Sequence, residues 1–161
     1  MKTLPIIFSQ EMLPLILSGR KTQERRVLKG SPRYEGVERL WVREIFRKVV
    51  REYMFDESPF KTTYFYKANY EQNEANKYEC PPLYMPKEAA RTWLQVKTYH
   101  TDTLWNISEE NAIAEGVSGR DEYFALWDSL NTKRGYPTCS NPWVEVIEFE
   151  VEKEINSLNR G

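Results

Sequence analysis

The sequence predicts an α+β fold, a small mixed or antiparallel β-barrel with about three flanking helices. About six segments have the length and alternation of strands, whereas about three short ones have helical periodicity. The two kinds of segment do not alternate as β–α–β repeats would require. With 161 residues, 40% of them hydrophobic, the chain can bury a core of its own. We therefore expect one domain over residues 1–161, with loop insertions around 51–61 and 69–82.

The chain is expected to begin with a strand and a short helix. Residues 4–8 form an apolar run of strand length, and the Ser9 side chain can then cap a helix. Pro14 fits that helix only in its first turn, where a missing N–H is tolerated. Gly19 is expected to end the helix, because glycine adopts the left-handed conformation of a helix terminus. Residues 21–28 then continue as strand or extended chain.

Residues 39–48 alternate as a strand does, with an apolar face interrupted by a glutamate and a basic, partly aromatic face. The apolar face holds Leu40, Val42 and Phe46, and the other face holds Arg39, Trp41, Arg43, Ile45 and Arg47. Interleaved basic and aromatic groups suit nucleic acid, since arginines pair with phosphates and rings stack on bases. The alternative is that Trp41 packs under another element and the arginines are solvated.

The middle of the chain is expected to contain loops around one strand. Polar residues 51–61 predict a hairpin loop or an insertion, and the Tyr- and Phe-rich residues 62–68 predict a strand. Residues 69–79, followed by Pro81 and Pro82, predict a long loop. Such loops are binding or lid segments in some proteins and disordered in others.

The C-terminal half is expected to contain two strands and two helices. Residues 89–99 predict a long strand, Ser108 caps a short helix that runs to Glu115, and Gly116 ends it. A second helix over 120–131 has an apolar stripe at i, i+3, i+4 and i+7, which we assign to the core: Tyr123, Leu126, Trp127 and Leu130. The last strand alternates Ile147, Phe149 and Val151 with glutamates 148, 150 and 152, which face water.

Charge is distributed unevenly along the chain. The formal net charge is −1 and the pI is about 6.0, so net charge alone does not attract nucleic acid. Residues 18–48, however, contain ten Lys or Arg and four Glu, a local excess of six positive charges. Such a region can steer a phosphate-bearing ligand to one face. A solvated basic surface is the alternative interpretation.

Metal, redox and membrane roles are not expected. Cys80 and Cys139 are far apart and His100 is the single histidine, so no metal site and no cofactor are predicted. The N-terminus lacks the apolar core of a signal peptide, and no apolar run approaches the ~20 residues of a membrane span. We expect a reduced, cytoplasmic protein without a membrane partner, and nothing in the sequence favours a particular oligomeric state.

Several motifs occur in an order that resembles the ASCH domain, especially the longer ASCH proteins common in bacteriophage and prophage genomes. The resemblance covers residues 7–149. Its motifs are GRKTQERR (19–26), LWVRE (40–44), MPKEAAR (85–91), ISEENAIAEGV (107–117), LWDSLN (126–131) and NPWVEVIEF (141–149). It implies a PUA-like fold, a small β-barrel with helices around it, and a cleft between the barrel and the first helix. One departure is Gly36-Val37-Glu38, where family members commonly have Gly-Asp before the LWVRE strand.

The resemblance also implies site residues. Family members are regarded as RNA-binding or nucleotide-handling proteins, and a short bacterial member is an amidohydrolase that deacylates N4-acetylcytidine. Its pattern, similar to GRKTxTxR with a downstream glutamate, places the lysine on Lys21 and the glutamate on Glu115. The attacking threonine is replaced by Glu24. A carboxylate cannot supply that hydroxyl, although it can act as a general base on water. Thr22 lies two residues earlier, on the same side of an extended strand.

These residues support three functional hypotheses. The first is a module that binds RNA or a modified nucleotide without turning it over, which the missing threonine favours. Its ligand-binding residues would be Arg20, Thr22, Arg25, Arg26 and Arg43, with Lys21 and Glu115 in the same cleft and Trp41 and Tyr66 as stacking platforms. The second is a hydrolase of N-acylated nucleosides that uses Lys21, Glu24 and Glu115; a structural ion-pair cluster is the alternative interpretation of those three residues. The third is a phage accessory protein that binds a host protein through the loop at 69–79.

Overall fold

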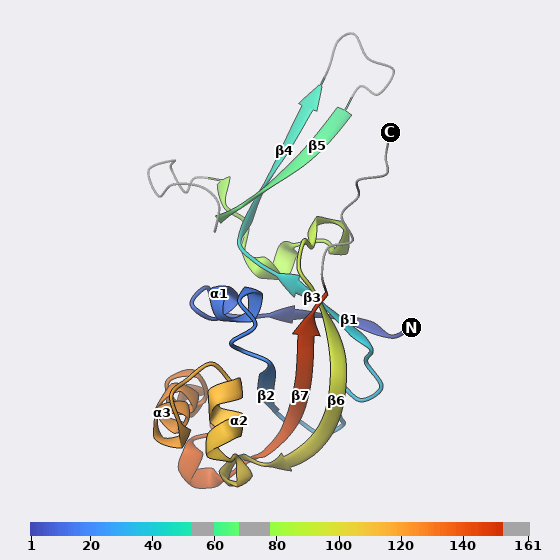
Figure 1. Cartoon of the computed structure of the whole chain (residues 1–161). Coiled ribbons are helices and arrows are strands. Elements are labelled where there is room, and N and C mark those ends of the chain that lie inside the picture. Colours follow the sequence, from blue (N-terminus) through green and yellow to red (C-terminus); the bar gives the residue numbers. More distant parts are fainter. Residues whose placement is uncertain (53–59, 68–77, 153–161) are drawn as a thin grey trace.

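A curved, mixed five-stranded sheet forms the body of the molecule (Figure 1). The computed structural model describes residues 1–52, 60–67 and 78–152. The sheet order is β1-β3-β6-β7-β2, where β1 and β3 are parallel and the other neighbours are antiparallel. The strands are β1 (Thr3–Ile7), β2 (Gln23–Val27), β3 (Arg39–Arg43), β6 (Trp93–Thr103) and β7 (Trp143–Val151). Within the described residues β1 and β2 are the two edges and do not pair, so the sheet is open.

Helices flank this sheet, as the α+β prediction requires. The short helix α1 (Met12–Leu17) follows β1. The helices α2 (Glu109–Ala114) and α3 (Arg120–Asn131) lie side by side near the start of β7 (Figure 1). The α+β class and the three flanking helices are therefore confirmed. Short 3-10 turns occupy Pro82–Tyr84, Lys87–Ala89, Leu104–Asn106, Thr132–Arg134 and Thr138–Ser140 in the described part of the chain.

The predicted single strand over 39–48 is in fact two strands. It breaks after β3, and β4 (Phe46–Glu52) pairs with β5 (Phe60–Tyr66) in a separate hairpin that projects from the body (Figure 1). The break falls at Glu44, a buried carboxylate that accepts two hydrogen bonds from the Arg91 guanidinium at 2.8 and 2.7 Å. A buried charge requires such a partner. The predicted loops fall largely on residues 53–59 and 68–77, which lie outside the described residues.

Two apolar clusters pack against the sheet. Ile16 of α1 packs with Leu40, Leu94 and Phe149 in one cluster. The second lies beneath α2 and α3 and contains Leu104, Ile107, Ala112, Val117, Tyr123, Trp127, Val144 and Val146. The predicted core stripe of α3 is confirmed at Tyr123 and Trp127. It is wrong at Leu130, which lies on the same helix face but is 53% exposed in the last turn of α3.

The two predicted N-caps differ in the structure. Ser108 caps α2, and its Oγ accepts a hydrogen bond from the Asn111 N–H at 3.0 Å. The prediction for Ser9 is wrong, because α1 begins after Glu11 and has no side-chain cap. Ser9 contributes its backbone carbonyl instead, which accepts from the Met12 N–H at 3.1 Å. Gly19, with φ of +77°, follows the end of α1 as predicted.

Three further findings concern cysteines, membranes and metal ligands. Cys80 and Cys139 are both free thiols. Over the described ranges, none of the helices has the length and apolar character needed to cross a bilayer. The same residues contain no group of three or more His, Cys, Asp or Glu side chains placed to hold a metal ion.

Ser108→Ala is expected to lower the free energy of unfolding by about 1 kcal/mol, because the first turn of α2 loses its cap. Ser9→Ala is the matched control and should change it little, since the Ser9 side chain caps nothing. Urea unfolding of both variants checks this. Equal losses in the two variants would contradict the assignment of the caps.

Candidate functional site

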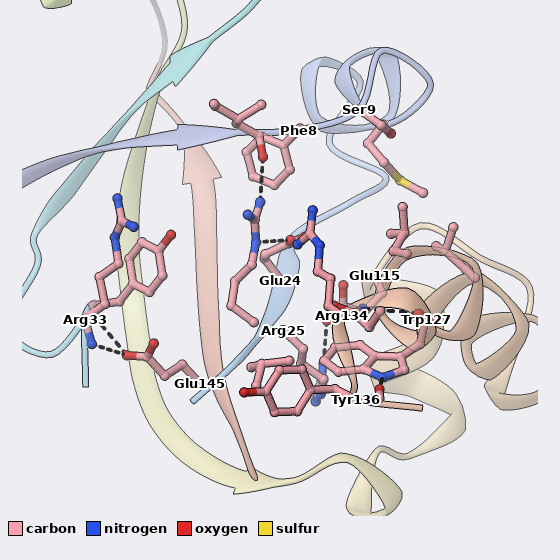
Figure 2. A pocket seen from close by; sticks show the side chains of 18 of the residues that line it. Phe8, Ser9, Glu24, Arg25, Arg33, Glu115, Trp127, Arg134, Tyr136 and Glu145 are labelled. Atoms are coloured by element: carbon pink, nitrogen blue, oxygen red, sulfur yellow. Dashed lines mark hydrogen bonds and ion pairs between the residues drawn. The ribbon is translucent and has the colours of Figure 1, made fainter. Parts of the chain in front are cut away.

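A cavity of about 650 Å³ lies beside β2, bounded by the end of β1, the start of α1, the β2–β3 loop and α3 (Figure 2). Charged groups and aromatic rings both line it. Six cationic side chains face three carboxylates, which leaves an excess of three positive charges. The cations are Lys21, Arg25, Arg26, Lys29, Arg33 and Arg134; the carboxylates are Glu24, Glu115 and Glu145; the rings are Phe8, Tyr34, Tyr123, Trp127 and Tyr136.

Lys21 is the centre of an ion-pair network in the inner wall. Its side chain is 3% exposed, and Nζ lies 2.8 Å from Glu115 Oε2 and 2.9 Å from Glu24 Oε2. It also donates to the backbone carbonyls of Gln23, at 2.7 Å, and Glu115, at 3.0 Å. The ammonium is therefore surrounded by protein oxygens that replace its water.

Two arginines complete the network from the other side of each carboxylate. Arg25 Nη1 lies 2.8 Å from Glu115 Oε1, and Arg26 Nε lies 2.6 Å from Glu24 Oε1. Arg26 Nη2 donates further to the backbone carbonyl of Ile7 at 2.6 Å, which connects β2 to the end of β1. Each glutamate thus bridges the central ammonium and one guanidinium, and every one of the four carboxylate oxygens has a cationic partner.

Backbone contacts fix the chain where it enters the network. The Thr22 N–H donates to the carbonyl of Ala114 at the end of α2, at 2.8 Å, and the Thr22 carbonyl accepts from the Phe149 N–H of β7, at 2.9 Å. Gly116 follows the bridging glutamate at φ of +101°, and a Cβ built there would lie 3.4 Å from Lys21 Cβ. Three elements distant in sequence are therefore held together at this point.

The network shifts the pKa values of the Glu24 and Glu115 carboxyl groups in opposite directions. Burial acts to lower the pKa of Lys21, but the charges of Glu24 and Glu115 outweigh it and raise that pKa above its ordinary value. Burial acts to raise the pKa of Glu24, yet Lys21 and Arg26 lower it overall. The pKa of Glu115 is raised, first by burial and then by the charge of Glu24. Glu24 is thus the strongly ionised member, and Glu115 is the one that takes up a proton more readily.

The structure brings together five of the predicted site residues: Lys21, Glu24, Arg25, Arg26 and Glu115. Arg20 and Thr22 are neighbours in sequence, but neither lines the cavity. Arg20 is exposed on the turn after α1, and Thr22 is held by its backbone between α2 and β7. The attacking hydroxyl considered at Thr22 is therefore absent from the cavity wall.

The predicted stacking platforms lie elsewhere. Trp41 is buried, and the Arg43 guanidinium covers its ring at 4.6 Å from the centroid. Tyr66 belongs to the projecting hairpin, where its hydroxyl donates to a backbone carbonyl at 2.7 Å and Arg91 covers its ring at 4.1 Å. Neither ring nor Arg43 lines the cavity. Trp41 and Arg43 belong to β3, which β6 and β7 separate from β2 in the sheet, and Tyr66 belongs to the hairpin. The expectation that they share one cleft with Lys21 is corrected.

Sequence reasoning missed Glu145. It is 2% exposed, and its Oε1 accepts hydrogen bonds from the N–H groups of Arg33 and Tyr34, at 2.8 and 2.9 Å, and from the Tyr99 hydroxyl at 3.0 Å (Figure 2). Burial, followed by this carboxylate, raises the pKa of Tyr99 to about 12. No described residue hydrogen-bonds to Oε2. The sequence did contain a signal for Glu145. It lies two residues before the inward-facing Ile147 of β7, and residues two apart on a strand point to the same face.

The aromatic wall was missed as well, apart from the helical stripe. Tyr34 comes from the β2–β3 loop, where Glu145 holds its backbone. Tyr136 follows α3, and its backbone carbonyl accepts from Trp127 Nε1 at 2.8 Å. Both rings sit on segments between regular elements, where periodicity carries no information. They give the cavity flat apolar surfaces beside its charges.

Gly116→Ala is expected to destabilise the protein more than Gly135→Ala. Both glycines have positive φ, +101° and +89°, which costs an alanine about 1–2 kcal/mol. Only at Gly116 would the new Cβ also crowd neighbours, at 3.1 Å from Leu15 Cδ1 and 3.4 Å from Lys21 Cβ; at Gly135 no described atom lies within 4 Å. Urea unfolding measures the difference, and equal losses would contradict a tight approach at Lys21.

Glu24→Gln is expected to weaken the loss of stability in acid. Because the folded-state pKa of Glu24 lies below 4.5, its charge contributes stability above that pH, and this is lost as the pH falls through the lowered pKa. The contribution of Glu115 has the opposite sign: it is present below pH 4.5 and is lost as the pH rises through the raised pKa.

Unfolding free energies from about pH 3 to pH 7 test this assignment. Glu115→Gln serves as the matched variant and should retain the acid loss that Glu24→Gln weakens. If the unfolding free energies of the two variants depend on pH in the same way, the opposite pKa shifts assigned to Glu24 and Glu115 are contradicted.

Comparison with known proteins gives one structural similarity. No family model matches the chain, and no curated protein matches it. A solved structure that does match is the crystal structure of the ASCH domain from Lactobacillus crispatus JV V101. The match covers 92% of this chain and 79% of that one, with 11% sequence identity and a TM-score of 0.49.

Proposed function

We propose that the cavity beside β2 binds RNA or a modified nucleotide. The observation that carries this proposal is the excess of three positive charges next to aromatic rings in a cavity of about 650 Å³. Ligand pockets for small molecules are commonly about 300–1,000 Å³. Phosphates require cations and bases require flat apolar surfaces, so a nucleotide satisfies both features at once.

The carboxylates give the cavity a means to recognise a base. Glu145 is buried and has one oxygen without a hydrogen bond from the described residues, so it can accept an N–H from a base edge. Glu24 and Glu115 also line the cavity, but their oxygens are already paired with cations, so Glu145 is the acceptor available to a ligand. Base edges that present amino groups fit such acceptors, whereas the rings of Tyr34 and Tyr136 supply stacking that does not depend on sequence.

Tyr136→Ala tests the proposal. It is expected to weaken binding of a labelled single-stranded RNA roughly 5- to 150-fold, the range for removal of one stacked base. Trp143→Ala is the matched control, since Trp143 is 58% exposed and does not line the cavity. Fluorescence anisotropy gives both affinities. Absence of binding by the wild type to RNA, nucleosides and nucleotides would overturn the proposal, and equal weakening in both variants would move the site elsewhere.

A second candidate is hydrolysis of an N-acylated nucleoside, which the meeting of Lys21, Glu24 and Glu115 favours. In such a reaction Glu24 would accept a proton from a water that attacks the acyl carbon, and Lys21 would stabilise the developing oxyanion. With N4-acetylcytidine, water would be consumed and cytidine and acetate released. The network argues for binding alone, because both carboxylates are already saturated by cations and no threonine or serine stands at position 24.

Incubation with N4-acetylcytidine followed by chromatography separates the two candidates. We expect no cytidine from the wild type, because the hydroxyl nucleophile is missing. Cytidine released by Glu24→Thr would show that the cavity accepts this ligand and lacks only the nucleophile. Release by the wild type that Glu115→Gln abolishes would establish the hydrolase instead.

Three finer expectations stay predictions. Binding of a host protein through residues 69–79 falls mainly on residues 69–77, outside the described part of the chain. Location in the cytoplasm and similarity to the phage- or prophage-type ASCH proteins are the other two. Deleting the loop should leave RNA affinity unchanged if the cavity is the binding site.

A further inference from the structure

We propose that Lys29 and Arg134, two exposed cations that line the cavity together with Tyr136, form a phosphate subsite at its mouth. The ligand class is therefore a nucleotide that carries a phosphate, rather than a neutral nucleoside. This inference rests on the proposed function and adds where the phosphate binds. The sequence predicts ligand binding at Arg25 and Arg26, with Lys21 in the same cleft, but all three cations are engaged in the ion-pair network.

The inner cations are already neutralised. Lys21 is shared by two carboxylates, and Arg25 and Arg26 each pair with one of them at 2.8 and 2.6 Å. A phosphate that entered there would meet Glu24 or Glu115 beside every cation. To pair with Lys21 or Arg25 it would have to displace a carboxylate from a buried ion pair. Breaking such a pair leaves a buried charge uncompensated, which is strongly unfavourable.

The outer cations are different. Lys29 and Arg134 are exposed, and the described residues supply neither of them with a hydrogen bond or a carboxylate partner. Lys29 Nζ lies 5.7 Å from the centroid of the Tyr136 ring, and Arg134 precedes that tyrosine by two residues. Both side chains line the cavity, as does Tyr136. Their charge accounts for most of its positive excess, because the inner network nearly balances itself.

Fixed backbone holds this corner in place. Tyr136 is held from two sides, because its N–H donates to the Asn131 carbonyl at 3.1 Å and its carbonyl accepts from Trp127 Nε1 at 2.8 Å. The labelled Arg134 and Tyr136 lie on the α3 side of the cavity, whereas Arg33 lies on the side of Glu145 (Figure 2). A base that stacks on Tyr136 would therefore have, within the same cavity, two cations for its phosphate that no carboxylate of the described residues neutralises.

The test compares the four common ribonucleosides with their 5′-monophosphates by calorimetry, using the full chain. Wild type is expected to prefer the monophosphates roughly 10- to 100-fold, the range for charge-assisted hydrogen bonds. Lys29→Gln combined with Arg134→Gln should abolish this preference, so that the affinity for each monophosphate falls to that for its nucleoside. Lys133→Gln is the matched control: it removes one positive charge from the residue next to Arg134, and Lys133 does not line the cavity.

The outcomes separate this inference from the proposed function. Equal affinity of the wild type for nucleosides and monophosphates would overturn the phosphate subsite and leave nucleoside binding in place. A preference that survives in the double variant would place the phosphate elsewhere and would equally overturn it. Failure of the wild type to bind nucleosides, monophosphates or RNA would overturn both.

Binding of an RNA oligonucleotide distinguishes a free nucleotide from a nucleotide within a chain. If the subsite holds a phosphate of a strand, the slope of log affinity against log salt should fall by roughly 0.7 for each cation–phosphate pair that the substitutions remove, and it should stay constant in Lys133→Gln. A slope that is unchanged in the double variant, together with abolished preference for monophosphates, would assign the subsite to free nucleotides.

Discussion

The structure depends on one buried ammonium group that two carboxylates share. Lys21 lies between Glu24 and Glu115, and it brings the start of β2 into contact with the end of α2. Transfer of an unpaired lysine from water into such a site would be costly, so the surrounding oxygens determine whether this part of the fold forms at all. The cavity wall follows from that requirement, because every residue that neutralises the ammonium also faces the cavity or supports a group that does.

A buried network of this kind specifies geometry better than it contributes stability. Its ion pairs repay the cost of desolvation only when each oxygen and each cation finds a partner, and here all four carboxylate oxygens do. The inner wall is therefore rigid and electrically almost balanced. The mouth carries most of the unbalanced charge, so the proposed binding would use different parts of one cavity for an anion and for a neutral base.

Local signals in the sequence were sufficient for much of the fold. Ser108 and Gly116 marked the limits of α2, and the alternation of β7 and the stripe of α3 marked their buried faces. The break after β3 could not be predicted, because it depends on Arg91 reaching Glu44 from a segment far away in the sequence. Four charged residues of the network, Lys21, Glu24, Arg25 and Arg26, lie in the single motif GRKTQERR. The rings of Tyr34 and Tyr136 lie in turns, where no periodic pattern marks a residue as facing a cavity.

The open sheet has a further consequence at β2. This strand pairs with β7 on one side only, within the described residues, and an unpaired strand edge is a template for association with another chain. Three charged residues in succession, Glu24, Arg25 and Arg26, occupy its centre. Charges at such a position discourage a second strand from adding to the edge. The residues that build the cavity wall thus also protect the protein against edge-to-edge aggregation.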